Sequence, residues 1–380
     1  MIYLDNAATT FYKPETVYQA VADTMRYKGV NVGRGGYHLA IEASDLVYQC
    51  RENLGRLFHT DRTERICFAQ NTTDALNLAI HGLLKQGDHA IIGSMEHNSV
   101  LRPVHTLAEA GLITYSVALA DSDGVVRAEA VERLIQPETR LIALNHASNV
   151  CGSISDIAAI AALAKERAIP FLIDAAQSAG ALDINVEKLP VALLAFAGHK
   201  GLYGPQGTGG LYIAPGIELE PVRQGGTGSL SESYRQPGLL PDRYESGTLN
   251  LPGIAGLSAG VEYILEQGTA QIVAHEADLV KMLLEGLCNM NGVTVYGIKQ
   301  PQRQTGVVAF TLQGTDSVEL CEWLDQNHGI AARGGLHCAP LAHKTLGTLS
   351  TGVVRFSVSA FTSKDDIKKA ISAIYQKTIE

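Results

Sequence analysis

One lysine, Lys200, stands in a glycine-rich segment between two apolar runs, residues 192–196 and 209–213, which both predict buried strands. Turn-forming residues occupy the segment between them, namely Gly201, Gly204, Pro205 and Gly207. In a confined apolar pocket a lysine loses proton affinity, because burial disfavours the ammonium group, and a neutral amine can form a Schiff base with an aldehyde cofactor. The alternative is a solvated loop lysine with a salt partner, since exposure is usual for this residue type.

Polar side chains that could serve this lysine follow other apolar runs of the chain. They lie in QNTT (70–73), MEHNS (95–99), NHASNVCG (145–152), DAAQ (174–177) and GHK (198–200). The runs alternate with helical patterns, which predicts a mostly parallel sheet covered by helices. Ligands bind outside the carboxyl ends of the strands in such sheets. We therefore expect these five polar sets to meet around Lys200.

The first candidate role is the binding of a phosphate group. Thr72 and Thr73 precede an apolar-periodic helix, so their hydroxyls and the unpaired amides of its first turn suit an anion. Simple helix capping is the alternative for both threonines. Asp174 ends a predicted buried strand and could pair with a protonated ring nitrogen, although a strand-end aspartate is commonly a helix cap.

The remaining sets offer contacts for a planar ring. Gln177 and Asn149 carry amide donors for a ring oxygen, and His97 carries a flat imidazole that could stack on the ring. A lone histidine is more commonly an ordinary surface or core residue. Taken together, a phosphate cradle, an acid for a ring nitrogen, a stacking imidazole and a Schiff-base lysine are what pyridoxal 5′-phosphate requires.

The motifs QNTT, EHNS, SNVCG, DAAQ, FAGHKGLYGPQGTGG and YESGTLN, in this order, resemble the class V aminotransferase group of fold-type I pyridoxal-phosphate enzymes, particularly its cysteine desulfurases and selenocysteine lyases. The likeness runs from LDNAATT to about Phe361. It implies that Lys200 carries the cofactor, that His97 stacks on its ring and that Asp174 pairs with the ring nitrogen. The other cofactor contacts that it implies are Asn149 and Gln177 on the ring oxygen, Thr73 and His199 on the phosphate, and Thr248 reaching the phosphate of a partner subunit.

A homodimer is thereby implied. One position departs from the pattern: many relatives have a phosphate-binding serine two residues before the lysine, where this chain has Ala197. The lost hydrogen bond to a charged group would be worth about 1.5–3 kcal/mol, so we expect weaker cofactor retention rather than none.

A second reactive group is expected in the loop 332–347, ARGGLHCAPLAHKTLG. Cys338 follows two glycines and His337 there, and access together with a nearby imidazole favours thiolate chemistry; an unremarkable loop cysteine is the alternative. The resemblance implies that Cys338 forms a persulfide and that Arg355 binds the substrate carboxylate. Arg333 in the same loop and Arg34 in the glycine-rich stretch 29–38 are further candidates for substrate binding, although Arg34 could equally be solvated.

The other five cysteines carry no Cys-x-x-Cys pair, so neither a disulfide framework nor a zinc site is indicated, and no metal ligand is expected. Cys50, Cys288 and Cys321 fall in helical patterns and Cys67 in a strand, where we expect buried, inert thiols. We expect Cys151 to line the cofactor pocket.

The elements that must position these groups predict an α/β protein, and the resemblance implies that it is of the fold-type I class. The length of 380 residues suggests two lobes, and we place a large cofactor-binding domain with a seven-stranded-type sheet at residues 14–252. Residues 1–13 and 253–380 should form a smaller α+β domain that carries the cysteine loop. Within the sheet region the pattern predicts elements at 65–69, 73–84, 90–93, 99–110, 112–117, 141–145, 157–168 and 171–173.

Composition excludes other classes of protein. The hydrophobic content is 46%, the charged content 18% and the net charge −9, so no nucleic-acid partner is expected. The amino terminus shows no leader and no apolar run is long enough for a membrane span, so we expect a cytoplasmic protein without membrane contact.

The hypothesis is therefore a cysteine desulfurase that converts L-cysteine to L-alanine and forms a persulfide on Cys338, with a sulfur-acceptor protein as a possible further partner. The alternatives are selenocysteine lyase, an aminotransferase or epimerase, and a non-catalytic sulfur-carrier scaffold.

Overall fold

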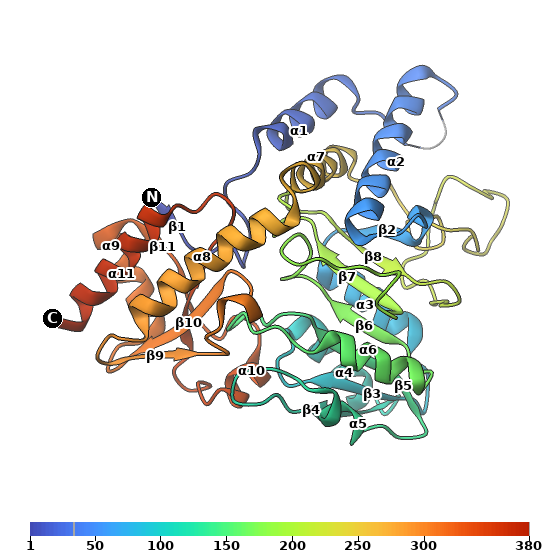
Figure 1. Cartoon of the computed structure of the whole chain (residues 1–380). Helices are drawn as coiled ribbons and strands as arrows, with labels where there is room; N and C mark the ends of the chain where they lie inside the picture. Colours follow the sequence, from blue (N-terminus) through green and yellow to red (C-terminus); the bar gives the residue numbers. More distant parts are fainter. Residues whose placement is uncertain (33–34, 380) are drawn as a thin grey trace.

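The structure is a computed structural model that describes residues 1–32 and 35–379. Two lobes lie side by side (Figure 1). The larger lobe is built on a seven-stranded sheet with the strand order β2-β8-β7-β6-β5-β3-β4. Its strands are β2 (Ile66–Ala69), β3 (His89–Gly93), β4 (Thr114–Ala118), β5 (Thr139–Asn145), β6 (Phe171–Asp174), β7 (Leu193–Ala197) and β8 (Gly209–Ile213). Only β8 runs against its two neighbours, β7 and β2, while the pairs from β4 to β7 are parallel.

Helices cover both faces of this sheet because alternate strand residues point to opposite sides. One face packs on α3 (Thr72–Leu83) and α4 (Asn98–Glu109), with Leu172 and Leu193 in that core. The other face packs on α2 (His38–Phe58), α6 (Ile157–Glu166) and α7 (Leu251–Gln267), with the neighbouring Phe171 and Leu194 in that core. The parallel strand ends that carry the polar sets are therefore fixed from both sides.

The smaller lobe is built on a four-stranded antiparallel sheet with the order β12-β13-β10-β9. Its elements are α8 (Thr269–Leu287), β9 (Val293–Tyr296), β10 (Val307–Leu312), α9 (Ser317–His328), β11 (Ile330–Ala331), β12 (Arg333–Gly335), α10 (Pro340–Thr345), β13 (Val353–Ser357) and α11 (Lys364–Ile379). Leucines of α8 pack on this sheet together with α9 and α11.

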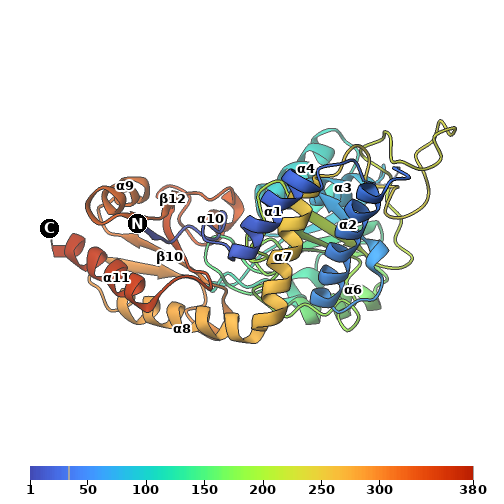
Figure 2. The ribbon, with the colours of Figure 1, turned by 90° about the horizontal axis from the view of Figure 1, so that it is seen from above.

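The amino-terminal segment belongs to both lobes. Strand β1 (Ile2–Tyr3) pairs in parallel with β11 of the smaller lobe. The chain then passes to α1 (Glu15–Tyr27), which packs beside α7 at the larger lobe (Figure 2). The remaining short elements are α5 (Ala128–Glu132) and two 3₁₀ turns, Thr63–Arg65 and Pro301–Arg303.

The sequence predictions for the sheet lie within a few residues of these bounds, and the predicted α/β fold with a mostly parallel seven-stranded sheet is confirmed. The prediction of one loop over residues 332–347 is wrong, because that stretch contains β12 and α10. Pro340 is the first residue of α10, where its missing N–H costs nothing. The division into domains at residue 252 stays a prediction.

No helix among the described residues is long and apolar enough to cross a bilayer.

Candidate active site

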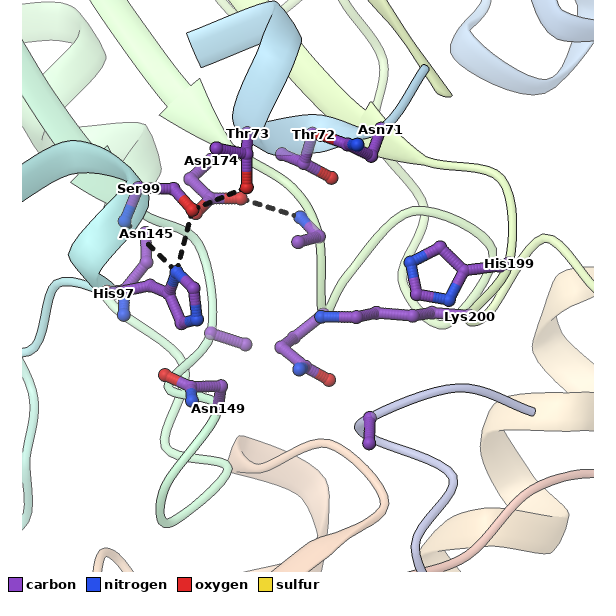
Figure 3. Close-up of a pocket in the computed structure, with 14 residues that line it drawn as sticks. Asn71, Thr72, Thr73, His97, Ser99, Asn145, Asn149, Asp174, His199 and Lys200 are labelled. Atoms are coloured by element: carbon purple, nitrogen blue, oxygen red, sulfur yellow. Dashed lines mark hydrogen bonds between the residues drawn. The ribbon is translucent and has the colours of Figure 1, made fainter. Parts of the chain in front are cut away.

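A cavity of about 310 Å³ opens at the carboxyl ends of β5 and β6, within the size range of small-molecule sites. Figure 3 shows the side chains that reach it from several elements. Eight predicted residues line it, namely Thr72, Thr73, His97, Asn149, Asp174, Gln177, His199 and Lys200. The five polar sets of the sequence therefore meet in one place, although the role of each residue toward a ligand stays a prediction.

Lys200 and Asp174 form the charged centre of the cavity. Burial lowers the pKa of Lys200 to about 8, and the charge of Asp174 opposes part of that shift. Burial likewise raises the pKa of Asp174, although a hydrogen bond from the Ala176 N–H (2.9 Å) and the charge of Lys200 favour its ionised form. The cavity thus holds an amine that can gain or lose a proton near neutral pH, opposite a carboxylate.

His97 is fixed by the start of α4. It is the N-cap residue of that helix, and its Nδ1 accepts a hydrogen bond from the Ser99 N–H at 3.1 Å. The Ser99 hydroxyl lies 2.9 Å from the same Nδ1 and 2.7 Å from the hydroxyl of Thr73. Burial lowers the pKa of His97 to about 4, with the charge of Lys200 acting in the same direction. The ring is therefore neutral at pH 7.

Ser99 was not among the predicted site residues, yet it connects His97 to Thr73. The available signal was its position in MEHNS, two residues after His97, which precedes the helix.

The start of α3 offers an anion site. Neither Thr72 nor Thr73 caps this helix, so the alternative of simple helix capping by the threonines is wrong. The cap is Asn71, whose Oδ1 accepts from the Asp74 N–H at 2.9 Å, while Thr72 is already the first helical residue. The hydroxyl of Thr72 and Nδ1 of His199 are buried without a hydrogen-bond partner. Burial lowers the pKa of His199 to about 4. These orphan groups, together with the amides of the first helical turn, are available to a phosphate.

The two predicted ring-oxygen donors each have one bond to the backbone. Asn149 Nδ2 donates to the carbonyl of His337 at 2.8 Å, and Gln177 Nε2 donates to the carbonyl of Ala7 at 2.9 Å. A side-chain amide carries two N–H donors, so each residue keeps one. Asn149 thereby connects the cavity to the backbone beside Cys338.

Cys338 is exposed and, with His97, lines an open cavity of about 540 Å³ next to the first one. Its carbonyl accepts from the N–H of Asn98 at 2.7 Å, at the start of α4. His337 and Cys338 both have left-handed backbone angles, with φ of 48° and 55°. Such angles are costly for residues other than glycine, and they cluster at functional sites.

The expectation that the neighbouring imidazole activates Cys338 is wrong. The ring of His337 is buried, and its Nε2 donates to the carbonyl of Val353 at 3.1 Å. Burial lowers the pKa of His337 to about 3, so the ring is neutral and supplies no positive charge to the thiol. His337 instead anchors the segment that presents Cys338.

The predicted carboxylate-binding arginines lie beside the cavity rather than in its lining. Arg355 Nη1 donates to the carbonyl of Asn149 at 2.8 Å, and Arg355 Nη2 donates to Asp5 at 2.9 Å. Arg333 also binds Asp5. Nε of Arg355 is buried without a partner, and its N–H is one of the donors that remain for a ligand.

Other predicted residues lie elsewhere. Thr248 lines a separate cavity of about 320 Å³ with Arg223 and Glu245, and Arg34 lies outside the described residues. Cys151, expected to line the pocket, is instead fully buried with its Sγ 3.4 Å from the Ser153 hydroxyl. Cys288, expected to be buried, is exposed at the end of α8. Among the described residues no cluster of His, Cys, Asp or Glu could hold a metal ion.

A model of the family "Aminotransferase class-V" matches residues 2–370. The chain belongs to the class V aminotransferase family. Two similar members are each named "Probable cysteine desulfurase". One, from Halalkalibacterium halodurans, is 35% identical over 100% of this chain and 93% of its own length. The other, from Methanothermobacter thermautotrophicus, is 33% identical over 97% of this chain and 92% of its own length.

Solved structures with a similar fold include a cysteine desulfurase. The apo structure of a cysteine desulfurase from Thermococcus onnurineus superposes with a TM-score of 0.93, at 33% identity, over 100% of this chain and 94% of that chain. The resemblance stated from the sequence motifs is confirmed.

Proposed function

We propose that this class V protein is a pyridoxal 5′-phosphate-dependent cysteine desulfurase that converts L-cysteine to L-alanine and receives the sulfur on Cys338. One observation carries the proposal: Lys200, Asp174 and His97 share a polar cavity, and His97 also lines the adjoining cavity into which exposed Cys338 opens. The names of its full-length relatives support the same reaction.

The residues present fit the cofactor. The hydroxyl of Thr72 and Nδ1 of His199 are buried without partners near the start of α3, where a phosphate would satisfy them. Asp174 lies within the same cavity, where it would pair with a protonated ring nitrogen. When bound, pyridoxal 5′-phosphate supplies an electron sink for the bond-breaking at the substrate amino acid. Ala197 at the strand end offers no hydroxyl for the phosphate, as the sequence indicates.

The side chains of the protein then have separate roles in the reaction. Lys200, with a pKa of about 8, can take the substrate's Cα proton at its Nζ and return it elsewhere on the carbon skeleton. Neutral His97 lines the same cavity and would pack against the ring without adding charge. The unpaired Nε–H of Arg355 is available to hold the substrate carboxylate.

Cys338 acts on the sulfur. Its thiolate attacks the substrate sulfur, so that a sulfur–sulfur bond forms and the carbon–sulfur bond breaks, with the electron pair passing to carbon. Protonation of that carbon gives alanine, and Cys338 is left as a persulfide. A thiol reductant or a sulfur-acceptor protein must then reduce it before the next turnover.

We further propose a homodimer. Large apolar side chains are exposed on α1 and α2, namely Tyr18, Met25, Tyr27, Ile41 and Tyr48. A second copy of the chain over this face would cover them, since exposed apolar patches commonly mark interfaces. Thr248 would then be available to the phosphate of the other copy, as the family resemblance implies.

The test is product analysis with the cofactor-loaded protein, L-cysteine and a thiol reductant. Alanine and sulfide should appear in equal amounts, and without the reductant each chain should gain the mass of one sulfur atom at Cys338. Selenocysteine and alanine in parallel reactions distinguish a selenocysteine lyase and an aminotransferase.

Cys338→Ser should lose sulfide release from cysteine, whereas Cys288→Ser, a matched exposed cysteine, should keep it. Full desulfuration by Cys338→Ser would refute the role of that thiol. The absence of alanine from the reaction with L-cysteine would refute the proposed activity.

A further inference from the structure

Asp5 lies between Arg333 and Arg355, the two candidates for substrate binding that the structure describes. Its Oδ2 accepts two hydrogen bonds from Arg333, from Nε at 3.0 Å and Nη2 at 2.8 Å. Its other oxygen, Oδ1, accepts from Nη2 of Arg355 at 2.9 Å. One carboxylate of the chain itself therefore already occupies both guanidinium groups.

The two ion pairs differ in their exposure to water. The side chain of Arg355 is 3% exposed and that of Asp5 is 13% exposed, while Arg333 is 52% exposed. Water screens the pair with Arg333, whereas the pair with Arg355 is desolvated and acts at closer to full electrostatic strength. Asp5 therefore affects mainly the charge that Arg355 presents.

The backbone holds Asp5 in this position. Asp5 bridges Ser357, two residues beyond Arg355, and the Ser357 N–H donates to the carbonyl of Leu4 at 2.7 Å. Asn6 Nδ2 donates to the carbonyl of Ser357 at 2.9 Å. The segment around Asp5 thus runs as an added partner along the end of β13, so the carboxylate has little freedom to leave the arginines.

The arginine cluster is close enough to the cavity to act on its contents. Arg355 donates to the carbonyl of Asn149, a lining residue. The charges of Arg355, Arg333 and Asp5 all affect the proton affinity of Lys200. Two guanidinium groups and one carboxylate give this corner of the site, made of Arg333, Arg355 and Asp5, a formal charge of +1.

From this arrangement, and resting on the proposed function, we infer that Asp5 is a specificity-determining residue that restricts the site to amino acids with a single carboxylate. A net charge of +1 is balanced by the α-carboxylate of an amino acid with a neutral side chain, such as cysteine. A second carboxylate on the ligand would leave the corner with excess negative charge and would face Asp5 as a like charge. Without Asp5, two guanidinium groups would be free to hold two carboxylates.

The experiment uses the cofactor-loaded protein and two probes without an amino group, propionate and succinate, which cannot react with the cofactor. Calorimetric titration gives the ratio of the succinate affinity to the propionate affinity. Asp5→Asn keeps the size of the side chain and removes its charge, so this ratio should rise about tenfold or more. Arg333→Gln removes a positive charge from a half-exposed side chain and should change the ratio in the opposite direction.

The double variant Asp5→Asn/Arg333→Gln restores a formal charge of +1 and should bring the ratio back toward the wild-type value. Asp121→Asn is the matched control, because Asp121 binds Nε and Nη2 of Arg127 at 3.0 and 2.8 Å, the same distances as in the Asp5–Arg333 pair. Its ratio should equal that of the wild type.

An unchanged ratio in both Asp5→Asn and Arg333→Gln would overturn the inference, as would a double variant that behaves like Asp5→Asn alone. Because the probes report binding without turnover, a failure of the proposed selection by Asp5 is distinguishable from a failure of the proposed reaction. In the latter case cysteine gives no alanine, whatever the binding ratio.

Discussion

The cavity around Lys200 and the segment that presents Cys338 adjoin each other, but they are built in different ways. Asp174 and His97 occupy a strand end and a helix N-cap, and both have hydrogen bonds to nearby backbone amides. His337 and Cys338 lie between β12 and α10 with two consecutive left-handed backbone angles. Regular elements therefore fix the groups whose charge must be controlled, whereas the thiol stands on a strained turn.

The difference matches the proposed tasks of the two regions. An ionised carboxylate and an amine with a shifted pKa need a constant, partly dry environment, because their charges depend on burial. A sulfur atom that is taken from a substrate and handed to an acceptor must face two partners in turn. A strained segment costs on the order of 1–3 kcal/mol per residue, and it is closer in energy to other conformations than a relaxed one.

The largest expected effect concerns the cavity around Lys200. Asp174→Asn keeps the shape of the side chain but removes the charge beside Lys200, so the turnover number for alanine formation should fall about 100-fold or more. Cofactor-saturated enzyme assayed with L-cysteine gives the value. Asp183→Asn, an exposed carboxylate that pairs with His59, is the control and should keep the wild-type rate. Wild-type turnover by Asp174→Asn would remove the electrostatic role assigned to the cavity.

The next effect concerns the stability cost of Lys200 in cofactor-free protein. The pKa of Lys200 falls from its ordinary 10.5 to about 8 on folding, because of burial. Below pH 8 the folded chain must hold a buried ammonium group, and between pH 8 and 10.5 the unfolded chain binds more protons, so the cost disappears as the pH rises through this window. Water reaches part of the Lys200 side chain and offsets part of this cost, so Lys200→Met should raise the free energy of unfolding at pH 7 by about 2 kcal/mol.

Urea unfolding at pH 7 and at pH 10 measures this difference. The gain in stability of Lys200→Met over wild type should shrink at the higher pH. Lys188→Met removes an exposed lysine and should show no such dependence on pH. An equal gain at both pH values would mean that the folded site does not shift the proton affinity of Lys200.

The smallest effect concerns the strained segment. Glycine adopts left-handed angles without steric cost, so Cys338→Gly should be more stable than Cys338→Ala by about 1 kcal/mol. Cys288 is also exposed but has a right-handed φ of −65°, so the order of the two variants should reverse there. Chemical denaturation of the four variants tests both signs. The same order at both positions would show that Cys338 is not strained.

The cavity can be located from the sequence because each segment that contributes to it has a local pattern. An apolar run of four or five residues ending in a polar set predicts a strand end, and parallel strand ends meet at one edge of a sheet. Asp174 and Lys200 could be found in this way. The motif order added the identity of the family.

The remaining features depend on contacts that are distant in the sequence. Asp5 lies 328 residues from Arg333 and 350 from Arg355, so no local pattern joins the three side chains. The direction of the His337 ring depends on the carbonyl of Val353 across the turn. The exposure of Cys288 follows from where α8 ends, which periodicity predicts only to within a turn of helix.

The 350-residue separation of Asp5 and Arg355 also has a consequence for how the protein is made. The whole seven-stranded sheet lies between the two residues, so it can fold on its own contacts while the chain is still being synthesised. The segment around Asp5 can pair with the end of β13 only after β13 has been synthesised. The corner of the site where Asp5 meets Arg355 is thus completed only after Asp174 and Lys200 have been synthesised.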